Sequence, residues 1–199
     1  MRTRGLPVVA LVCSAMLILG CAGAGPAAGQ GRDVVLVNLG DAGEVAAWTT
    51  VNDPGMGGKS TARVEFGNGE LVFSGDVSLE NNGGFASARG PQNPEIGRRA
   101  AGATSLHVRA LGDGKTYVLK VGTAGQPWSY IQRFATEAGV QRNYELPVED
   151  FEPVAMRFDP APDAPQTLDP AVISQVSVYI LDKQQGPFAI ALFEISATA

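Results

Sequence analysis

The stretch DPGMGGKS, residues 53–60, ends like a phosphate-binding loop, whose pattern is G-x-x-x-x-G-K-[ST]. Asp53 stands where the pattern requires its first glycine, and the other three fixed positions match. A phosphate-binding loop also needs a helix behind it, because the phosphate rests on the N-terminus of that helix. The next residues, TARVEF, instead have the composition of a strand. We therefore expect no nucleotide binding, and we interpret the stretch as a tight loop with Met56 packed beneath it.

Acid–base and nucleophilic chemistry have few candidate residues. A Ser-His-Asp arrangement would have to use His107, the only histidine, and no G-x-S-x-G motif accompanies it. His107 lies opposite the apolar residues of an alternating stretch, so we expect it at the surface. Glycoside hydrolysis uses paired carboxylates instead. The candidates are Asp53, Glu80, Asp113, Glu149, Asp150 and Asp182. Acidic residues in turns usually stay solvated or cap the turn, so we expect a protein that is not an enzyme.

Metal and cofactor sites are not indicated by the sequence. The only cysteines are Cys13 and Cys21, both near the N-terminus, so the remaining chain can form neither a disulfide nor a cysteine-based zinc site. A structural calcium ion would need a set of oxygen ligands, and no D-x-[DN]-x-[DN]-G loop identifies one. We therefore expect no cofactor and assign no metal ligand, and the question of a structural calcium stays open.

The N-terminus has the order of a secretory signal: two arginines, an apolar run over residues 6–19, and then Gly20-Cys21. The run is shorter than the about 20 apolar residues of a membrane-spanning helix. Its end, LILGC, resembles a bacterial lipobox, which implies removal of residues 1–20 and a lipid on Cys21. The alternative is an ordinary signal that is cut near Ala28. We expect a lipoprotein anchored in the bacterial cell envelope, with the outer membrane favoured because Ala22 follows the cysteine.

Removal of the predicted signal would change the net charge from −5 to −7, because the segment carries two arginines and no acid. An acidic chain is unsuited to nucleic acid and to polybasic attachment on anionic lipid. Residues 21–33 are mostly glycine, alanine and proline, which predicts a flexible tether. Residues 34–199 have the length of a single domain that can bury a stable core.

The predicted domain is composed of strands and turns. ARVEF, SLHVRA, TYVLKV and QVSVYIL alternate apolar and polar residues, and we expect Val64 and Phe66 on the core face. FAIALFEIS is apolar on both faces and is typical of a central strand. GNG and GDG indicate hairpin turns, whereas five prolines within residues 150–170 favour a loop. Roughly ten strands predict an all-β sandwich or jelly roll.

Six longer stretches follow one another in a specific order: W..VNDPGMGGKS, FSGDVSLENNGGFASARG, VRALGDGKTYVLKV, YIQRF, YELPVEDFEP and YILDKQQGPFAIALFEI. Together they resemble the complex I intermediate-associated protein 30 family over residues 44–197. The resemblance implies a galactose-binding-like jelly roll, the architecture of many carbohydrate-binding modules. It also implies a role like that of the mitochondrial members, which are assembly chaperones for NADH:ubiquinone oxidoreductase. Pro54-Gly55 stands where the family more often has Gly-Val, and export would separate this protein from the cytoplasmic arm of complex I.

The family's motif positions lie in two polar, glycine-rich loops, which we interpret as partner-binding loops; the alternative is that they only close the end of the core. Their motif positions are Asp53, Met56, Gly57, Gly58, Ser60, Asn81, Asn82, Gly83, Gly84, Phe85 and Arg89. We expect the two loops to lie side by side at one end of the sandwich. Asp53 would accept hydrogen bonds from backbone N–H groups of the neighbouring turn or from Arg89.

Two functions of different class are therefore expected from the sequence. The first is a non-catalytic, lipid-anchored module that binds or assembles a protein partner. The alternative is a carbohydrate-binding module, in which Trp128 and Tyr130 would stack on sugar rings. Trp48 is a third aromatic candidate. Exposure of Trp128 and Tyr130 on a concave face would favour a sugar ligand, whereas their burial would favour a protein partner.

Overall fold

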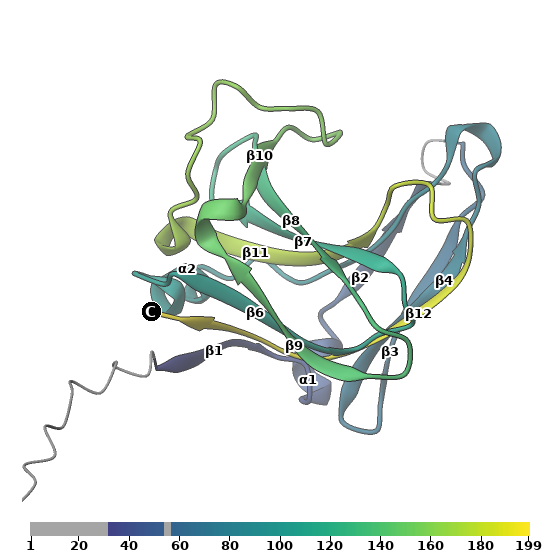
Figure 1. Ribbon diagram of the computed structural model, residues 1–199, viewed down its shortest axis with the longest axis horizontal. Coiled ribbons are helices and arrows are strands. Elements are labelled where there is room, and N and C mark those ends of the chain that lie inside the picture. The colour runs from purple at the N-terminus through teal and green to yellow at the C-terminus, as the bar shows by residue number, and fades with distance from the viewer. Residues whose placement is uncertain (1–31, 54–56) are drawn as a thin grey trace, which may run out of the picture. The chain divides into compact units, whose positions relative to one another are not determined.

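The computed structural model describes residues 32–53 and 57–199, in which the strands form two antiparallel sheets (Figure 1). The first sheet has the order β3-β4-β12-β6-β9, and β1 also pairs with β12. Its strands are β1 Asp33–Asn38, β3 Thr61–Gly67, β4 Glu70–Val77, β6 Ser105–Leu111, β9 Gln141–Pro147 and β12 Gly186–Thr198.

The second sheet has the order β10-β8-β7-β11-β5-β2. Its strands are β2 Thr49–Asn52, β5 Ala86–Arg89, β7 Thr116–Thr123, β8 Ser129–Ala135, β10 Glu152–Val154 and β11 Ile173–Ile180. The two sheets bury one continuous apolar cluster between them, which includes Phe73, Leu119, Val178 and Leu192. The predicted all-β sandwich is thus confirmed, with twelve strands in the described residues where roughly ten were expected.

Helices in the described residues are short. They are α1 Ala42–Val45, α2 Glu95–Ala100 and the 3₁₀ turns η2 Glu80–Asn82, η3 Val148–Asp150 and η4 Pro170–Val172. Four to six residues make little more than one turn, so a 3.6-residue apolar period cannot develop in them. Within the described ranges, no helix has the length and apolarity needed to span a membrane.

Strand β12 lies in the middle of the first sheet, as its apolar sequence predicts. It pairs with β6 along one edge, and along the other with β4 in its first half and β1 in its second half. The GNG turn joins β3 to β4 as a hairpin, which places Val64 opposite Phe73. Phe66 is a correction: it is 42% exposed, because β3 is the edge strand and the core ends beside it.

The prediction that GDG forms a hairpin turn is wrong. This turn follows β6 in the first sheet and precedes β7 in the second, so the chain crosses between the sheets there. Alternation and turn residues look the same in a hairpin and in a crossing between sheets. The proline-rich segment is mostly loop, as expected, apart from the three-residue strand β10 and the turn η4.

The side of the second sheet that faces away from the core carries its own small cluster, and we call this side the outer face. Alternation places Leu119 and Val178 in the core between the sheets, and Val118 and Tyr179 in a separate cluster with Ile131 and Val154. The loop that follows β10 covers part of the outer face through Phe158.

Candidate functional site

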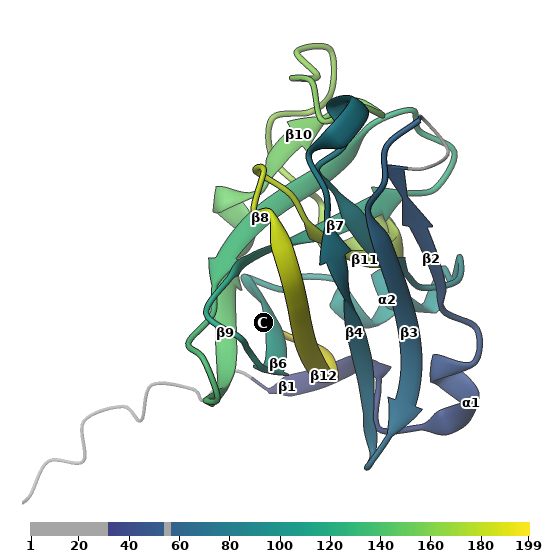
Figure 2. The same ribbon diagram turned by 90° about the vertical axis from the view of Figure 1, so that its right-hand side faces the viewer.

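The two predicted loops lie side by side, as expected from the sequence. One joins β2 to β3, and the other joins β4 to β5, so both lie at the same end of the β3–β4 hairpin (Figure 2). The side-chain amide of Asn81 donates to the carbonyl oxygen of Gly57 over 3.1 Å. Lys59 forms an ion pair with Glu80. The contacts join segments that are more than twenty residues apart in the chain.

Asp53 is the centre of this end of the sandwich. Its Oδ1 accepts from the backbone N–H of Ser60 at 2.8 Å, and its Oδ2 accepts from the Ser60 hydroxyl at 2.5 Å. The same Oδ2 also accepts from the backbone N–H groups of Gly84 at 2.7 Å and Phe85 at 3.3 Å. The predicted bonds from a neighbouring turn are therefore present. We call this arrangement the Asp53 lock, because one carboxylate ties both loops together.

The Asp53 carboxylate is buried but remains an anion. The residue is 1% exposed, and burial by itself would raise its pKa. The hydrogen bonds from Ser60, Gly84 and Phe85 outweigh burial and hold the pKa below the ordinary value. Each donor interacts best with the charged form, so the carboxylate is a weaker base than a free one. Its role in the described geometry is to hold the loops.

The glycines of the motif follow from this packing. A Cβ at Gly58 would lie 2.4 Å from the Asp53 carboxyl carbon, and a Cβ at Gly83 would lie 2.7 Å from Asp53 Oδ2. Gly84 has a φ of +133°, a backbone conformation that residues other than glycine rarely adopt. Only residues without a side chain allow both loops to approach the carboxylate so closely.

The tip of the second loop points to solvent. Asn81 and Asn82 have φ values of 55° and 60°, a left-handed conformation that asparagine tolerates better than most residues. Both are exposed, as are Lys59 and Glu80. The predicted loop residue Met56 lies outside the described residues. The Asp53 lock therefore presents a polar tip on a firmly bonded base.

Arg89 does not join this site, which corrects the sequence-based expectation. It is the last residue of β5, at the far end of that strand from Phe85, and it lies on the outer face. Its Nε donates to the Ser87 hydroxyl at 3.2 Å, and its guanidinium carbon lies 5.4 Å from the ring centre of Tyr179. The backbone of the neighbouring turn, and not Arg89, satisfies Asp53.

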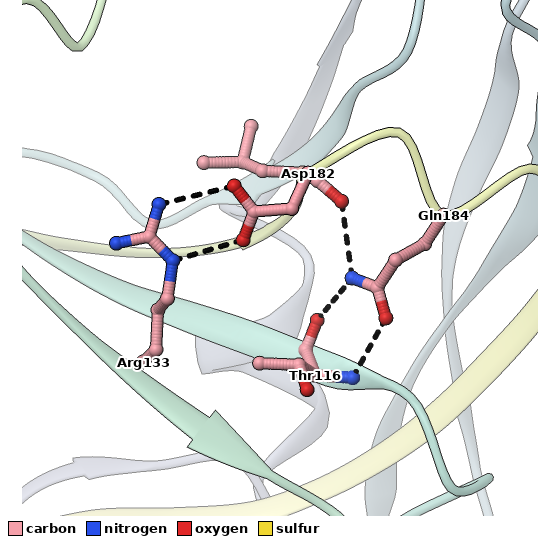
Figure 3. Close-up of polar contacts among 5 residues, drawn as sticks. Thr116, Arg133, Asp182 and Gln184 are labelled. Carbon is pink, nitrogen blue, oxygen red and sulfur yellow. Dashed lines mark hydrogen bonds and ion pairs between the residues drawn. The ribbon is translucent and has the colours of Figure 1, made fainter.

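A third loop, which sequence reasoning did not place, belongs to the same end. It is the turn between β11 and β12, drawn in Figure 3. The side chain of Gln184 accepts from Thr116 N–H at 2.9 Å and donates to Thr116 O at 2.6 Å, as a strand neighbour would. Lys183 has its Cα 4.0 Å from the place of a Cβ on Gly84, so this turn borders the second loop. The only sequence signal was the DKQQG stretch.

The candidate carboxylates do not pair with one another. Asp182 accepts two hydrogen bonds from Arg133, at 2.9 and 3.0 Å, and these bonds lower its pKa (Figure 3). Asp113 accepts from the Tyr117 hydroxyl at 3.0 Å and from the backbone N–H of Ala189 at 2.9 Å. No group of three His, Cys, Asp or Glu side chains suited to a metal occurs in residues 32–53 and 57–199.

The prediction that His107 lies at the surface is also wrong, because the residue is buried. It is 9% exposed, and its Nε2 lies 2.8 Å from the Thr198 hydroxyl oxygen. Strands β9 and β12 flank β6 on both sides, so their side chains cover the imidazole. Its contacts indicate a structural histidine.

The aromatic candidates for sugar stacking are mostly buried. Tyr130 is 2% exposed, faces the core between the sheets, and donates its hydroxyl to Pro165 O at 2.9 Å. Trp48 is also buried. Trp128 is half-buried and lines an open cavity of about 280 Å³ together with Thr167 and Asp169. Tyr130 lines the same cavity but exposes only 2% of its surface, so Trp128 is the more accessible of the two rings.

Solved structures similar to this chain are carbohydrate-binding modules and parts of larger enzymes. The family 11 module of the cellulosomal cellulase Lic26A-Cel5E of Clostridium thermocellum has a TM-score of 0.60 at 13% identity, over 84% of this chain and 95% of that one. The family 11 module from Clostridium thermocellum with a β-1,3-1,4-mixed-linked tetrasaccharide has a TM-score of 0.53 at 12% identity, over 78% and 90%. The agarase AgWH50C has a TM-score of 0.54 at 12% identity, over 85% of this chain and 25% of that one. These likenesses confirm the galactose-binding-like jelly-roll sandwich.

Sequence comparison identifies the family. No curated protein sequence matches the chain significantly. The family model described as complex I intermediate-associated protein 30 matches residues 37–192, which include both loops of the Asp53 lock and the turn between β11 and β12. The chain therefore belongs to the complex I intermediate-associated protein 30 family.

Proposed function

We propose that this protein is a non-catalytic binding module, anchored to the cell envelope through a lipid on Cys21, that holds a protein partner at the loop end. The observation that carries the proposal is the Asp53 lock, which fixes an exposed polar tip over a base of four hydrogen bonds. Loops held on a rigid scaffold are where binding residues tend to lie. The bonded state of the candidate carboxylates and the family match both support a role without catalysis.

The partner would be a protein of the envelope that needs help to assemble, by analogy with the family description. Cys21 and the predicted tether up to residue 31 lie outside the described residues, and Asp33, its expected last residue, belongs to β1. The tether would link the lipid to the domain. Replacement of Cys21 by serine should release the domain in soluble form or leave the precursor uncut. Intact mass of the purified protein checks this, and an unmodified N-terminus after Ala28 would contradict the anchor.

Asn82 is the sharpest place to test the loop tip. Asn82→Gly removes the exposed amide and keeps the left-handed backbone, so the melting temperature should stay within about 2 °C of the parent. Asn68→Gly is the matched control, because Asn68 has a φ of 54° and lies in the GNG turn at the other end of the same hairpin.

The measurement is capture of partners from the native membrane, with identification by mass spectrometry. We expect Asn82→Gly to lose most of the capture and Asn68→Gly to keep it. Equal capture by both variants would sink the proposal. A fall in capture that merely follows the folded fraction would show that the tip is only structural.

A carbohydrate is the second candidate ligand, because half-buried Trp128 borders a cavity with the polar side chains of Gln126, Thr167 and Asp169. Sugars stack on aromatic faces while polar groups bind their hydroxyls. Affinity electrophoresis in gels with mixed-linkage β-glucan tests it. Retardation that Trp128→Ala abolishes and Asn82→Gly leaves intact would favour the sugar over the protein partner.

A further inference from the structure

Three polar side chains form a row across the outer face of the second sheet. In the pairing register, Ser177 of β11 lies directly opposite Arg89 of β5 on one side and opposite Lys120 of β7 on the other. Side chains that lie opposite one another in a sheet point to the same face. Strands are about 4.8 Å apart, so the Cα atoms of the two cations are roughly 10 Å apart, with the small serine between them.

Tyr179 lies beside this row and contacts both cations. The Arg89 guanidinium carbon is 5.4 Å and the Lys120 Nζ is 5.6 Å from its ring centre, and Lys120 Nζ is also 4.8 Å from the ring centre of Phe158. Phe158 packs edge-on against Tyr179 with ring centres 5.0 Å apart. We call these four residues the Arg89–Lys120 cluster. Tyr179 is only 2% exposed, so its ring faces are already occupied.

The two cations have no carboxylate within ion-pair distance in the described residues. Six ion pairs occur there, and they engage Lys59, Arg63, Arg98, Arg109, Arg133 and Arg142. Arg89 and Lys120 have none, although the whole chain has 20 acidic side chains against 15 basic ones. Two half-buried positive charges face the same spot without an anion between them, in a protein that has acids in excess.

Neighbouring groups do not neutralise this spot. Burial first, and then the positive charge of Arg89, lower the pKa of Lys120. On β8, the strand next to β7, Arg133 forms an ion pair with Asp182. Glu152 of the edge strand β10 lies opposite Ile131 of β8, so β8 separates it from Lys120. In the pairing register, the charged side chains directly beside Ser177 are therefore the two cations Arg89 and Lys120.

An apolar hollow adjoins the cluster on the same face. A cavity of about 390 Å³ is lined by apolar side chains that include Ile131, Val154 and Phe158. Its polar members are Arg133, Glu152 and Gln166. Phe158 has a φ of 64°, which is rare for a bulky residue, and its ring centre lies 4.8 Å from Lys120 Nζ. Strain of this kind is kept only where the surroundings enforce it.

We propose that the outer face is a docking surface for an acidic segment of a partner protein. A carboxylate would bind over Ser177 between Arg89 and Lys120, and a neighbouring aliphatic side chain would enter the cavity beside Phe158. We choose an acidic partner because its carboxylates would complement the positive charges of Arg89 and Lys120. The covered faces of Tyr179 leave no ring for a saccharide to stack on, and the aliphatic wall of the cavity suits a peptide side chain better. This surface uses none of the residues of the loop tip.

The test is fluorescence anisotropy of the purified protein with two labelled peptides, GLEELEELG and its uncharged counterpart GLQQLQQLG. We expect the acidic peptide to bind at low salt, to weaken as salt rises, and to bind at least about tenfold more tightly than the uncharged peptide. Lys120→Gln and Arg89→Gln should each lower the affinity for the acidic peptide about tenfold. Lys115→Gln, a cation of the adjoining turn, is the matched control and should change nothing.

The outcomes separate this surface from the loop tip. Asn82→Gly should bind the acidic peptide with the affinity of the parent. Failure of the loop-tip proposal and failure of the outer-face proposal can therefore be told apart. Equal binding of the two peptides, no binding of either, or insensitivity to both Lys120→Gln and Arg89→Gln would overturn the proposal. Binding of labelled oligogalacturonate, with no binding of either peptide, would show that the occupant is an acidic saccharide instead. Melting temperatures confirm that the variants are folded.

Discussion

The Asp53 lock and the Arg89–Lys120 cluster both place charges in poorly solvated positions, but they differ in what surrounds those charges. Asp53 accepts four hydrogen bonds and needs no cation. Arg89 and Lys120 contact the Tyr179 ring, and among residues 32–53 and 57–199 neither forms an ion pair with a carboxylate. A buried charge whose partners are all internal stabilises the fold. A charge whose complement is missing from the fold is better explained by a partner from outside.

The largest effect should come from removing the carboxylate of the Asp53 lock. Asp53→Ala removes the acceptor from the buried backbone N–H of Ser60 and from the partly buried N–H groups of Gly84 and Phe85, which should lower the free energy of unfolding by about 3–5 kcal/mol. Urea denaturation measures it. Asp41→Ala is the control, because Asp41 caps the short helix α1 at the surface and should cost only about 1 kcal/mol. Equal losses in the two variants would show that the lock does not hold this end together.

The next effect concerns the close approach of the loops to the carboxylate. Gly58→Ala puts a methyl group 2.4 Å from the Asp53 carboxyl carbon, so the loop must shift, and we expect a loss of about 1–3 kcal/mol. Gly67→Ala is the control, since no atom lies within 4 Å of its added methyl group. If both variants melt at the same temperature, the glycines of the motif are not explained by packing.

A smaller effect should appear as acid sensitivity. The folded-state pKa of Asp53 is below its ordinary value of 3.8, so its contribution to stability is complete above that pH and is lost as pH falls through the folded pKa. The parent should therefore lose stability below about pH 4 more steeply than Asp53→Asn does. Urea denaturation along an acid series gives the two slopes. Parallel slopes would mean that folding does not lower the pKa of Asp53.

The smallest effect should come from the Arg89–Lys120 cluster, and this sharpens the comparison. Lys120→Gln removes one of two mutually repelling cations and also two cation–π contacts, and these opposite changes should leave the free energy of unfolding within about 1 kcal/mol of the parent. Urea denaturation at neutral pH checks it. A loss as large as that of Asp53→Ala would make Lys120 a structural residue and would remove the contrast between the two regions.

The sequence could predict the loops of the site but not its members from distant segments. Asp53, Gly58 and Gly83 stand out because glycine and asparagine concentrate around an isolated acid, which is a local signal. Gln184 was missed because its side chain pairs with Thr116, a residue 68 positions away. Arg89 was assigned to the wrong end, since nearness along the chain says little about which end of a strand a side chain occupies.

The sequence by itself determined the β class, the central position of β12 and the resemblance to the family, because strand period and local motifs are properties of short segments. The tertiary structure alone decided which turns are hairpins and which cross between sheets, since GNG and GDG look alike in the chain. It also decided that His107 and Tyr130 are buried and that Arg89 and Lys120 face one another across Ser177. Burial and cross-strand neighbours depend on which sheet and which register a strand adopts, and pairing between remote segments sets both.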